Sequence, residues 1–483
     1  MEPIVVVGGG IAGLGAAWTL RKQGLPVLVL EAWDQVGGVV RSRRLDDGTV
    51  LDLGPQTLST RDPELLATLE EVGLRGRRLE ASHEGARRYV VHDGAPVALP
   101  SGPVGLLRTP LLSAQGKLRL LSEPFRGSGS GNEEAREGSD ESVAAFARRR
   151  LGPEVAARLV DPFVSGVYAG DPEALSVAAV LPELQMMERE HGSLLRGGLE
   201  RLWARRGGNA SGDDAEAAAR RSRICSFDEG LQAWPIAVAR ALGPDTVRTG
   251  TRVEGITPRS GSSGQGWRVH LSGSSSGANE TVDARAVVLA VPAAVTASLL
   301  EGLGERASSP PHPLVEEGIH ALTRIPYAPV TLVHLIWRRD RIAHSLDGFG
   351  LLAPSREGRT LLGSLWPDTI FPDRNRTDRV VTVNFVGGAR TPDRALVPDE
   401  PLVAEVLREL EDLLGARGEP ELALVTRWPR AIPQYTRGHL DRIAAVARVE
   451  EALPGLRLIG NWRGGVSLGA AWEGGRKAAR GFG

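Results

Sequence analysis

The sequence predicts an α/β fold: a discontinuous Rossmann-like nucleotide-binding domain, a mixed α+β domain and a helical insertion. Three observations support this prediction. The chain begins with an apolar β-branched run, a glycine-rich turn and a helical pattern. Short apolar runs that suit the same sheet return near residues 286 and 458. With 483 residues, the chain is long enough for two or three domains between and around these runs.

The first elements follow the order of a dinucleotide-binding unit. Ile4–Val7 suits a buried parallel strand, and a helical stretch runs from Leu14 to about Gln23. A second apolar run, Val27–Leu30, ends at Glu31. Between the first strand and the helix lies the turn Gly8-Gly9-Gly10-Ile11-Ala12-Gly13. The alternative is a glycine turn without a nucleotide, but such a turn would not require a buried strand before it and a helix, a strand and an acidic residue after it.

Each glycine of the turn has a physical task. Gly8 permits a tight turn, Gly10 lets the backbone approach a pyrophosphate, and Gly13 lets the helix pack on the strand. The helix N-terminus attracts phosphate. About twenty residues on, Glu31 is placed to accept hydrogen bonds from ribose hydroxyls.

A second glycine pair favours FAD over NAD. Gly37-Gly38 follows Glu31 by a few residues, and Gly54-Pro55 comes next. In NAD dehydrogenases the chain normally returns to the sheet after the acidic residue. The alternative for Gly37-Gly38 is an ordinary turn.

Periodicity indicates the remaining elements. Helices are predicted over 63–73, 143–151, 154–159, 183–190 and 402–414, and strands over 267–271, 286–291, 330–337 and 380–386, with a last nucleotide-domain segment at 458–461. Two stretches rich in Gly, Ser, Glu and Asp, 127–138 and 207–214, are predicted to be solvated loops.

Composition excludes several function classes. The net charge of −1 gives no reason to expect nucleic acid as a partner. Cys225 is the only cysteine, so no intramolecular disulfide can form, and the nine histidines form no HExxH motif or close pair. We therefore expect no metal site. The chain enters a strand at Ile4, so we expect no signal peptide, and no apolar stretch is long enough to span a bilayer. The expected location is cytoplasmic.

Segments outside the glycine turn resemble one flavoprotein family. They include Ser165-Gly166-Val167-Tyr168-Ala169-Gly170-Asp171-Pro172, Gly348–Leu352, Val386–Arg390 and Ile432–Tyr435 with Gly438-His439. Their order and spacing are similar to those of protoporphyrinogen oxidases, bacterial members most closely, within the amine-oxidase-like superfamily. Amine oxidases and carotenoid desaturases would not explain the segments around Gly166 and His439.

The resemblance implies FAD as the cofactor and an amine-oxidase-like domain plan. FAD-binding parts would span 1–82, 223–292 and 426–483, a helical insertion 83–222, and a substrate-binding domain 293–425. The residues implied to contact FAD are Gly8, Gly9, Gly10, Ile11, Ala12, Gly13, Glu31, Gly38, Val39, Gly54, Pro55, Gln56, Thr57, Val253, Trp428, Asn461, Val466, Ser467 and Leu468.

The resemblance also implies the reaction: oxidation of protoporphyrinogen IX to protoporphyrin IX in haem biosynthesis, with oxygen reoxidising the flavin and giving hydrogen peroxide. Leu352, Leu365 and Phe385 would clamp the macrocycle, Gly166 would face the pyrrole nitrogens, and Arg88 would bind a propionate. No residue is assigned as a catalytic acid or base, because the cofactor carries the chemistry. Without the family, Arg88 would be half of a solvated surface pair with its neighbour.

Two departures from the family keep alternatives open. Leu468-Gly469-Ala470-Ala471-Trp472 replaces a Leu-Asn-Asp-Cys-Ile segment, so we expect the loss of a helix cap worth about 1 kcal/mol. Phe227–Gly230 has one glycine where the family has two. The alternatives are a flavin-dependent coproporphyrinogen III oxidase, whose pocket should hold more cations, and a catalytically silent FAD-binding homologue.

The helical insertion carries a candidate membrane surface. Apolar residues cluster at 104–107, 110–112 and 118–121, with Arg108, Lys117 and Arg119 between them. Such a pattern suits the boundary of an anionic membrane, and packing against neighbouring helices is the alternative. The expectation is peripheral contact with the cytoplasmic face of the cell membrane. A homodimer is also left open.

Overall fold

The computed structural model describes residues 1–100, 102–125, 140–198, 200, 224–261, 264–272, 280–307, 312–375 and 378–482. The predicted loops 127–138 and 207–214 lie outside the described residues. The chain divides into two compact units. The first comprises Met1–Leu79, Ile224–Pro326 and Leu440–Gly483, and the second Glu80–Arg223 and Tyr327–His439. The division into five functional segments remains a prediction.

A five-stranded parallel sheet forms the centre of the first unit. Its order is β10-β2-β1-β14-β20. The strands are β1 (Ile4–Val7), β2 (Val27–Leu30), β10 (Val247–Arg248), β14 (Ala286–Leu289) and β20 (Leu456–Leu458). All four residues of β1 are buried, as expected for a central parallel strand covered on both faces. The sheet confirms that segments from both ends and the middle of the chain build one domain.

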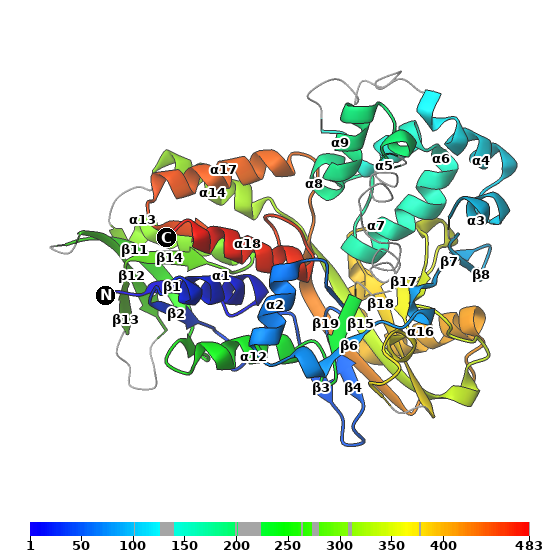
Figure 1. Ribbon diagram of the computed structural model, residues 1–483, viewed down its shortest axis with the longest axis horizontal. Helices are drawn as coiled ribbons and strands as arrows, with labels where there is room; N and C mark the ends of the chain where they lie inside the picture. Colours follow the sequence, from blue (N-terminus) through cyan, green and yellow to red (C-terminus); the bar gives the residue numbers. More distant parts are fainter. Residues whose placement is uncertain are drawn as a thin grey trace, which may run out of the picture. The chain divides into compact units, whose positions relative to one another are not determined.

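Two helices of the first unit pack closely on each other. Helix α1 (Ile11–Lys22) and helix α18 (Leu468–Arg480) run side by side, blue and red in Figure 1. A Cβ at Gly475 would lie 2.0 Å from the carbonyl oxygen of Ala12, so only glycine permits this approach. Trp472 is fully buried beneath the contact and packs on Trp234, with ring centroids 5.2 Å apart. The contact fixes where the N-terminus of α18 lies.

The first unit has three further small sheets and several helices. One sheet is the antiparallel β11-β12-β13, the others are β3-β4 and β5-β9-β6. The remaining elements, two of which cross the unit boundary by one residue, are β3 (Ser42–Arg44), β4 (Val50–Asp52), β5 (Leu58–Ser59), α2 (Pro63–Glu71), β6 (Arg78–Glu80), β9 (Ile224–Phe227), α12 (Ala233–Leu242), β11 (Val253–Gly261), β12 (Gly264–Leu271), β13 (Thr281–Ala284), α13 (Ala293–Ala307), α14 (Pro313–Thr323) and α17 (His439–Ala452).

A seven-stranded sheet forms the base of the second unit, in the order β19-β15-β18-β17-β16-β7-β8. Its strands are β7 (Arg88–His92), β8 (Ala95–Ala98), β15 (Tyr327–Arg338), β16 (Gly350–Leu352), β17 (Leu361–Leu365), β18 (Arg379–Gly387) and β19 (Leu422–Pro433). Neighbours are antiparallel except β16 and β7. Helix α16 (Asp399–Leu414) covers one face through Leu402, Val406 and Leu410. The predicted strands 330–337 and 380–386 and the predicted helix 402–414 are confirmed.

Short helices make up the rest of the second unit. They are α3 (Gly102–Arg108), α4 (Ala114–Leu121), α5 (Val143–Arg150), α6 (Pro153–Val155), α7 (Asp161–Tyr168), α8 (Val177–Val180), α9 (Pro182–His191) and α15 (Pro367–Ile370). The helix predicted over 154–159 is instead α6 followed by a π-helical turn at Ala156–Val160. Pro162, which has no amide hydrogen to donate, is the second residue after this turn.

The apolar cluster predicted as a membrane surface is only partly exposed. Leu111, Leu112 and Leu120 are buried, and the last two pack together inside the insertion. Their expected place on an exposed face is therefore wrong. Five other large apolar side chains in the same region are exposed: Val104, Leu107, Leu118, Leu121 and Phe125.

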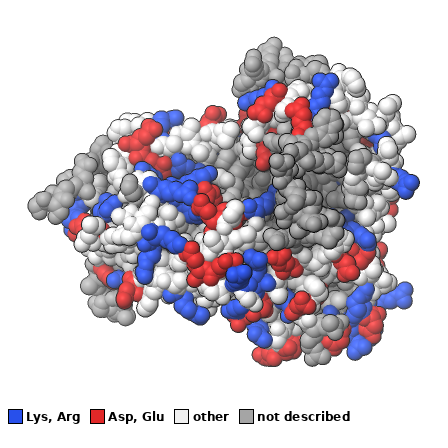
Figure 2. Space-filling model, viewed as in Figure 1, with Lys and Arg blue, Asp and Glu red and all other residues white. Residues whose placement is uncertain are grey.

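The charges of the described surface are mixed. On the face shown in Figure 2, lysine and arginine side chains are interspersed with aspartate and glutamate, in keeping with the net charge of −1. Within the described ranges, no helix combines the length and the apolarity needed to cross a membrane.

Candidate functional site

The glycine loop joins β1 to α1 in the first unit. Gly8 has a φ of 106°, and a Cβ at Gly13 would lie 1.9 Å from the carbonyl oxygen of Gly8. Packing within the protein therefore explains both glycines. Gly10, at the N-terminus of α1, is different, because an added Cβ would meet nothing within 4 Å. Space beside the backbone at this one position fits the close approach of a diphosphate. Ile11 and Ala12 begin the helix and are buried.

The second glycine pair lies against the first. The amide of Gly37 donates a 2.9 Å hydrogen bond to the carbonyl oxygen of Gly9, and Gly10 and Gly37 form a parallel bridge. Gly38 has a φ of 59°, and an added Cβ would lie 3.5 Å from the Cα of Gly10. The two motifs, separated by a strand and a helix in the sequence, thus form one glycine-lined surface.

Glu31 organises the end of β2. Its Oε2 accepts a 2.6 Å hydrogen bond from the amide of Gly9, and its Oε1 a 2.8 Å bond from the amide of Trp33. Its carbonyl oxygen accepts from the amide of Thr251, 2.8 Å away, which brings Val253 at the start of β11 into the neighbourhood. A carboxylate has about four lone-pair sites, so Glu31 retains acceptors for ribose hydroxyls.

The turn after β4 presents an unused acceptor. A Cβ at Gly54 would lie 2.1 Å from the carbonyl oxygen of Val39, so the two predicted segments touch. The side-chain amide of Gln56 donates to the carbonyl oxygens of Asp52 (2.6 Å) and Gly54 (2.9 Å). Its buried Oε1 has no hydrogen-bond partner among the described residues. Such an orphaned acceptor suits a donor from a bound cofactor. Pro55 and Thr57 flank it, half-buried.

The C-terminal segment ends at the start of α18. Asn461 lies just after β20, and Val466, Ser467 and Leu468 lead into the helix. The hydroxyl of Ser467 accepts a 3.2 Å hydrogen bond from the amide of Ala470. The expected loss of the helix cap is therefore wrong, because Ser467 supplies the cap that the altered segment lacks. This removes the main observation in favour of a silent homologue.

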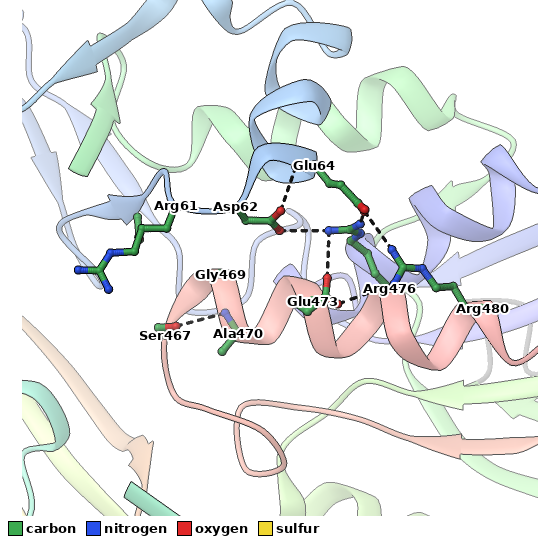
Figure 3. A pocket seen from close by; sticks show the side chains of 10 residues that line it. Arg61, Asp62, Glu64, Ser467, Gly469, Ala470, Glu473, Arg476 and Arg480 are labelled. Atoms are coloured by element: carbon green, nitrogen blue, oxygen red, sulfur yellow. Dashed lines mark hydrogen bonds and ion pairs between the residues drawn. The ribbon is translucent and has the colours of Figure 1, made fainter. Parts of the chain in front are cut away.

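A pocket of about 470 Å³ lies beside the cap (Figure 3). Three arginines and three carboxylates line it: Arg61, Arg476, Arg480, Asp62, Glu64 and Glu473. Arg476 of α18 contacts Asp62 at 3.1 Å and Glu473 at 2.9 Å, which ties α18 to the start of α2. Burial lowers the pKa of Arg476, although Asp62 opposes this shift. Sequence reasoning missed this network, whose partners lie more than 400 positions apart.

The second unit brings together the residues predicted to hold the substrate. In the register of the sheet, Leu352 lies opposite Gly363 and Gly363 opposite Phe385. Gly350 lies opposite Leu365 in the same way. Leu352, Leu365 and Phe385 therefore point to one face of the sheet, the face that α16 leaves uncovered. We call this set the apolar face. All three side chains are half-buried.

Helix α7 packs on the apolar face at Gly166. A Cβ at Gly166 would lie 2.4 Å from a methyl group of Leu352, so a larger residue would displace that leucine. Phe163 and Val167 share the exposed side of α7 with Gly166 and are 45% and 44% exposed. Sequence reasoning did not single them out. Phe163 lies three residues before Gly166 and four before Val167, and this helical spacing is the signal that could have found them.

Arg88 stands at the edge of this face, because it lies opposite Gly350 in the sheet. Its guanidinium stacks on Phe349, 4.8 Å from the ring centroid, and donates a 3.3 Å hydrogen bond to the carbonyl oxygen of Ala86. Burial lowers its pKa. In the part of the chain that the structure describes, no carboxylate pairs with it, whereas Arg87 pairs with Asp347. Of the two arginines predicted as a surface pair, Arg87 is thus bound by a carboxylate, and Arg88 is available to bind a substrate carboxylate.

Two further expectations concern Trp428 and the absence of a metal site. Trp428 lies in β19 of the second unit, opposite Val330. His92, Asp93 and Glu357 place potential ligand atoms within 4.8 Å of one another. Glu357 already accepts hydrogen bonds from the amides of Asp93 and Gly94, and we assign no metal there.

Comparisons with known proteins place the chain in a family. Residues 11–481 match the model of the flavin containing amine oxidoreductases. The chain is 31% identical to protoporphyrinogen oxidase 2 of Arabidopsis thaliana over 99% of its length and 92% of that protein. It is 33% identical to protoporphyrinogen oxidase of Bos taurus, covering 99% of the chain and 97% of the relative. A crystal structure of a protein from Exiguobacterium sp. 255-15 superposes with a TM-score of 0.79 at 24% identity, covering 100% of this chain and 98% of that one.

These findings confirm the predicted fold class and cofactor. The glycine surface, the free space at Gly10 and the orphaned acceptor of Gln56 all fit FAD. The chain is therefore a member of the flavin containing amine oxidoreductase family, it belongs to the protoporphyrinogen oxidases within that family, and it is an FAD-dependent oxidoreductase.

Proposed function

We propose that the protein oxidises protoporphyrinogen IX to protoporphyrin IX in haem biosynthesis. The observation that carries this proposal is the apolar face with Arg88 at its edge, a cation that has no carboxylate partner in the described ranges. Protoporphyrinogen is a large apolar macrocycle with two propionates, which is the chemistry that such a surface recognises. The names of the relatives point to the same substrate. When bound, FAD supplies the hydride acceptor, and oxygen takes up the electrons as hydrogen peroxide.

The residues of this chain bind and orient the substrate. Leu352, Leu365 and Phe385 would remove one face of the macrocycle from water, and each fully buried side chain of this size contributes about 1.5–3 kcal/mol. Arg88 would bind a propionate through its planar fork. We assign no acid or base: substrate protons leave by tautomerisation once hydride equivalents are removed, so orientation and exclusion of water are the protein's tasks.

Among the described residues, Arg88 is the cation at this face that has no carboxylate partner, which favours the dicarboxylate over coproporphyrinogen III with its four carboxylates. Arg87, the sequence neighbour of Arg88, is occupied by Asp347. An aerobic assay that follows porphyrin fluorescence with both porphyrinogens decides between them. We expect protoporphyrinogen to have the higher kcat/KM. A preference for coproporphyrinogen would reassign the substrate, and no oxidation of either would refute the proposal.

We also propose that the protein works in the cytoplasm, attached to the cytoplasmic face of the cell membrane through the insertion. Val104, Leu107, Leu118, Leu121 and Phe125 form an exposed apolar set on α3, α4 and the turn that follows. Arg108 is exposed on the same segment. Exposed apolar groups with neighbouring cations suit an anionic membrane surface, from which a poorly soluble macrocycle is easily collected.

A further inference from the structure

Arg390 binds the buried side of α7. Arg390 follows β18, and its Nη1 lies 2.6 Å from Oδ1 of Asp161 while its Nη2 donates to the hydroxyl of Ser165. Asp161 and Ser165 are four residues apart, which is one helical turn. The Asp161 side chain is only 9% exposed. The guanidinium group therefore binds two side chains one turn apart on the buried side of the helix.

Two more contacts hold the same helix. Oδ2 of Asp161 accepts a 2.8 Å hydrogen bond from the amide of Ser355, and Oδ1 accepts from its hydroxyl at 3.2 Å. At the other end, the amide of Ala389 donates a 2.7 Å hydrogen bond to the carbonyl oxygen of Ala169. Helix α7 is thus held at its start, along its length and at its end.

The contacts come from the strands that carry the apolar face. Ser355 follows β16, which ends at Leu352, and Arg390 follows β18, which contains Phe385. On its opposite side, α7 presents Gly166, where no space separates the helix from Leu352. Asp161 and Arg390 therefore determine how far Gly166 stands from the side chains predicted to clamp the macrocycle.

We propose that Arg390 and Asp161 are positioning residues, which hold Gly166 against the apolar face and so set the affinity for the macrocycle. This inference rests on the proposed function. The contacts of Gly166 and the apolar face with the macrocycle stabilise the bound substrate and the transition state equally. Their loss should therefore raise KM and leave kcat nearly unchanged. Displacement of α7 would weaken the binding of protoporphyrinogen and of protoporphyrin to a similar extent.

The test uses the full-length holoenzyme and four variants. Arg390→Gln should raise KM for protoporphyrinogen roughly tenfold, the size expected for a lost charge-assisted hydrogen bond. Arg390→Lys should restore part of this loss, because one ammonium reaches one partner. Ser165→Ala removes a single bond and should raise KM about threefold, which covers the case in which Arg390→Gln folds poorly. Arg394→Gln is the matched control, since Arg394 is exposed and pairs with Glu405, eleven residues further along the chain.

Two readouts accompany the kinetics. FAD content should stay at the parent level, and the Kd for protoporphyrin IX, measured by fluorescence titration, should rise with KM. An active parent combined with unchanged KM values in Arg390→Gln and Ser165→Ala would overturn the inference alone. A fall in kcat with constant KM, or loss of FAD, would also overturn it. A parent that oxidises neither porphyrinogen overturns the proposed function and the inference with it.

Discussion

The amide of Gly9 donates a 2.6 Å hydrogen bond to Oε2 of Glu31, which fastens the glycine loop to the end of the second strand. Glu31 is buried, and its other oxygen binds the amide of Trp33. The carboxylate therefore has a structural task in addition to the ribose contact proposed for it. Both tasks require a negative acceptor in the same place.

We predict that Glu31→Ala weakens FAD binding. The variant loses a charged acceptor worth about 1.5–3 kcal/mol, so the Kd for FAD should rise roughly ten- to a hundredfold. Reconstitution of the apoprotein, followed by quenching of flavin fluorescence, measures this Kd. Asp34→Asn, an exposed change three residues away, should keep the parent value. Equal FAD affinity in Glu31→Ala and the parent would contradict the prediction.

Arg88→Ala should raise KM for protoporphyrinogen roughly ten- to a hundredfold, because a charge-assisted carboxylate contact is lost. FAD content should not change, since Arg88 lies on the apolar face and not at the glycine loop. Steady-state kinetics by porphyrin fluorescence measure KM. The neighbouring Arg87→Ala is the control, because that side chain pairs with Asp347. Should both variants show the parent KM, Arg88 is only a surface residue.

The sequence allows the glycine loop to be predicted residue by residue, because its conformation is local. Gly8 has a φ of 106°, and a Cβ at Gly13 would lie 1.9 Å from the carbonyl oxygen of Gly8 in the same loop. The position of α7 could not be predicted in this way. Arg390 lies 225 residues from Ser165, and nothing in either segment indicates the other. Long-range pairing of this kind depends on the order of strands in the sheet.

Exposure was the other quantity that the sequence could not supply. Leu107 and Leu111 are the same residue type in neighbouring apolar clusters, yet Leu107 is 57% exposed and Leu111 is fully buried. Leu107 lies in α3 and Leu111 in the turn after it, and the apolar pattern does not indicate which side chain meets a neighbouring helix. For the same reason Phe163 and Val167 were missed, although Gly166 between them was predicted from the family.

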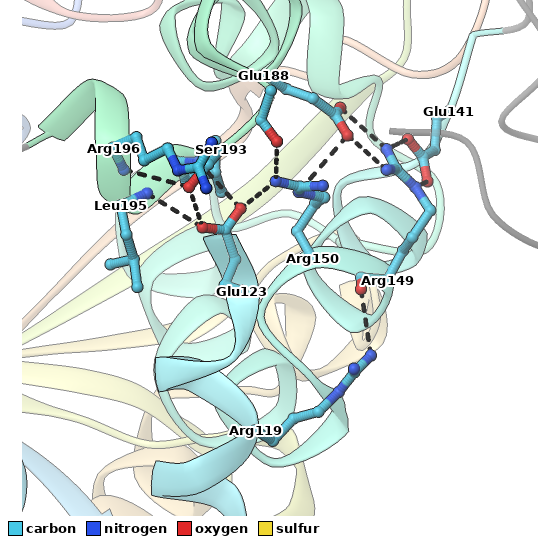
Figure 4. Close-up of polar contacts among 11 residues, drawn as sticks. Arg119, Glu123, Glu141, Arg149, Arg150, Glu188, Ser193, Leu195 and Arg196 are labelled. Atoms are coloured by element: carbon cyan, nitrogen blue, oxygen red, sulfur yellow. Dashed lines mark hydrogen bonds and ion pairs between the residues drawn. The ribbon is translucent and has the colours of Figure 1, made fainter. Parts of the chain in front are cut away.

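A buried ion cluster inside the insertion makes its stability depend on pH (Figure 4). Arg150 and Glu123 pair at 1% and 0% side-chain exposure. Burial opposes the charged form of Glu123, but the hydroxyl of Ser193, the amides of Leu194 and Leu195, and Arg150 together lower its pKa below the usual 4.5. Glu123 therefore contributes stability that is complete above pH 4.5 and is lost as the pH falls through the lower, folded-state pKa.

We predict that Glu123→Gln lowers the melting temperature at pH 7, because the charge of Arg150 is left without its buried partner. Removing one member of a buried pair costs about 3–5 kcal/mol. The difference in melting temperature between parent and variant should shrink as the pH falls below 4.5. Calorimetry from pH 7 to pH 3 tests this, with the exposed Glu400→Gln as control. A difference that stays constant over this range would exclude the proposed role of Glu123.

The last prediction concerns the exposed apolar set of the insertion. Leu107, Leu118 and Phe125 are 57%, 70% and 85% exposed, which is unusual for side chains of this size. If they insert into a membrane surface, binding should survive high salt, because burial of apolar area is not screened. Arg108 should add a component that salt removes. If these side chains instead pack against other protein surfaces, neither salt-resistant nor salt-sensitive membrane binding is expected.

Co-sedimentation with anionic liposomes at low and high salt measures both components. Combining Leu107→Ser, Leu118→Ser and Phe125→Ser should abolish binding at high salt, because each replacement removes about 1.5–3 kcal/mol of apolar burial. The control combines Leu396→Ser and Leu440→Ser, which are exposed elsewhere at 61% and 52%. This control should bind like the parent. A parent protein that stays in the supernatant at low salt rules out the membrane surface, and equal binding of the triple variant and the parent assigns the contact to another part of the chain.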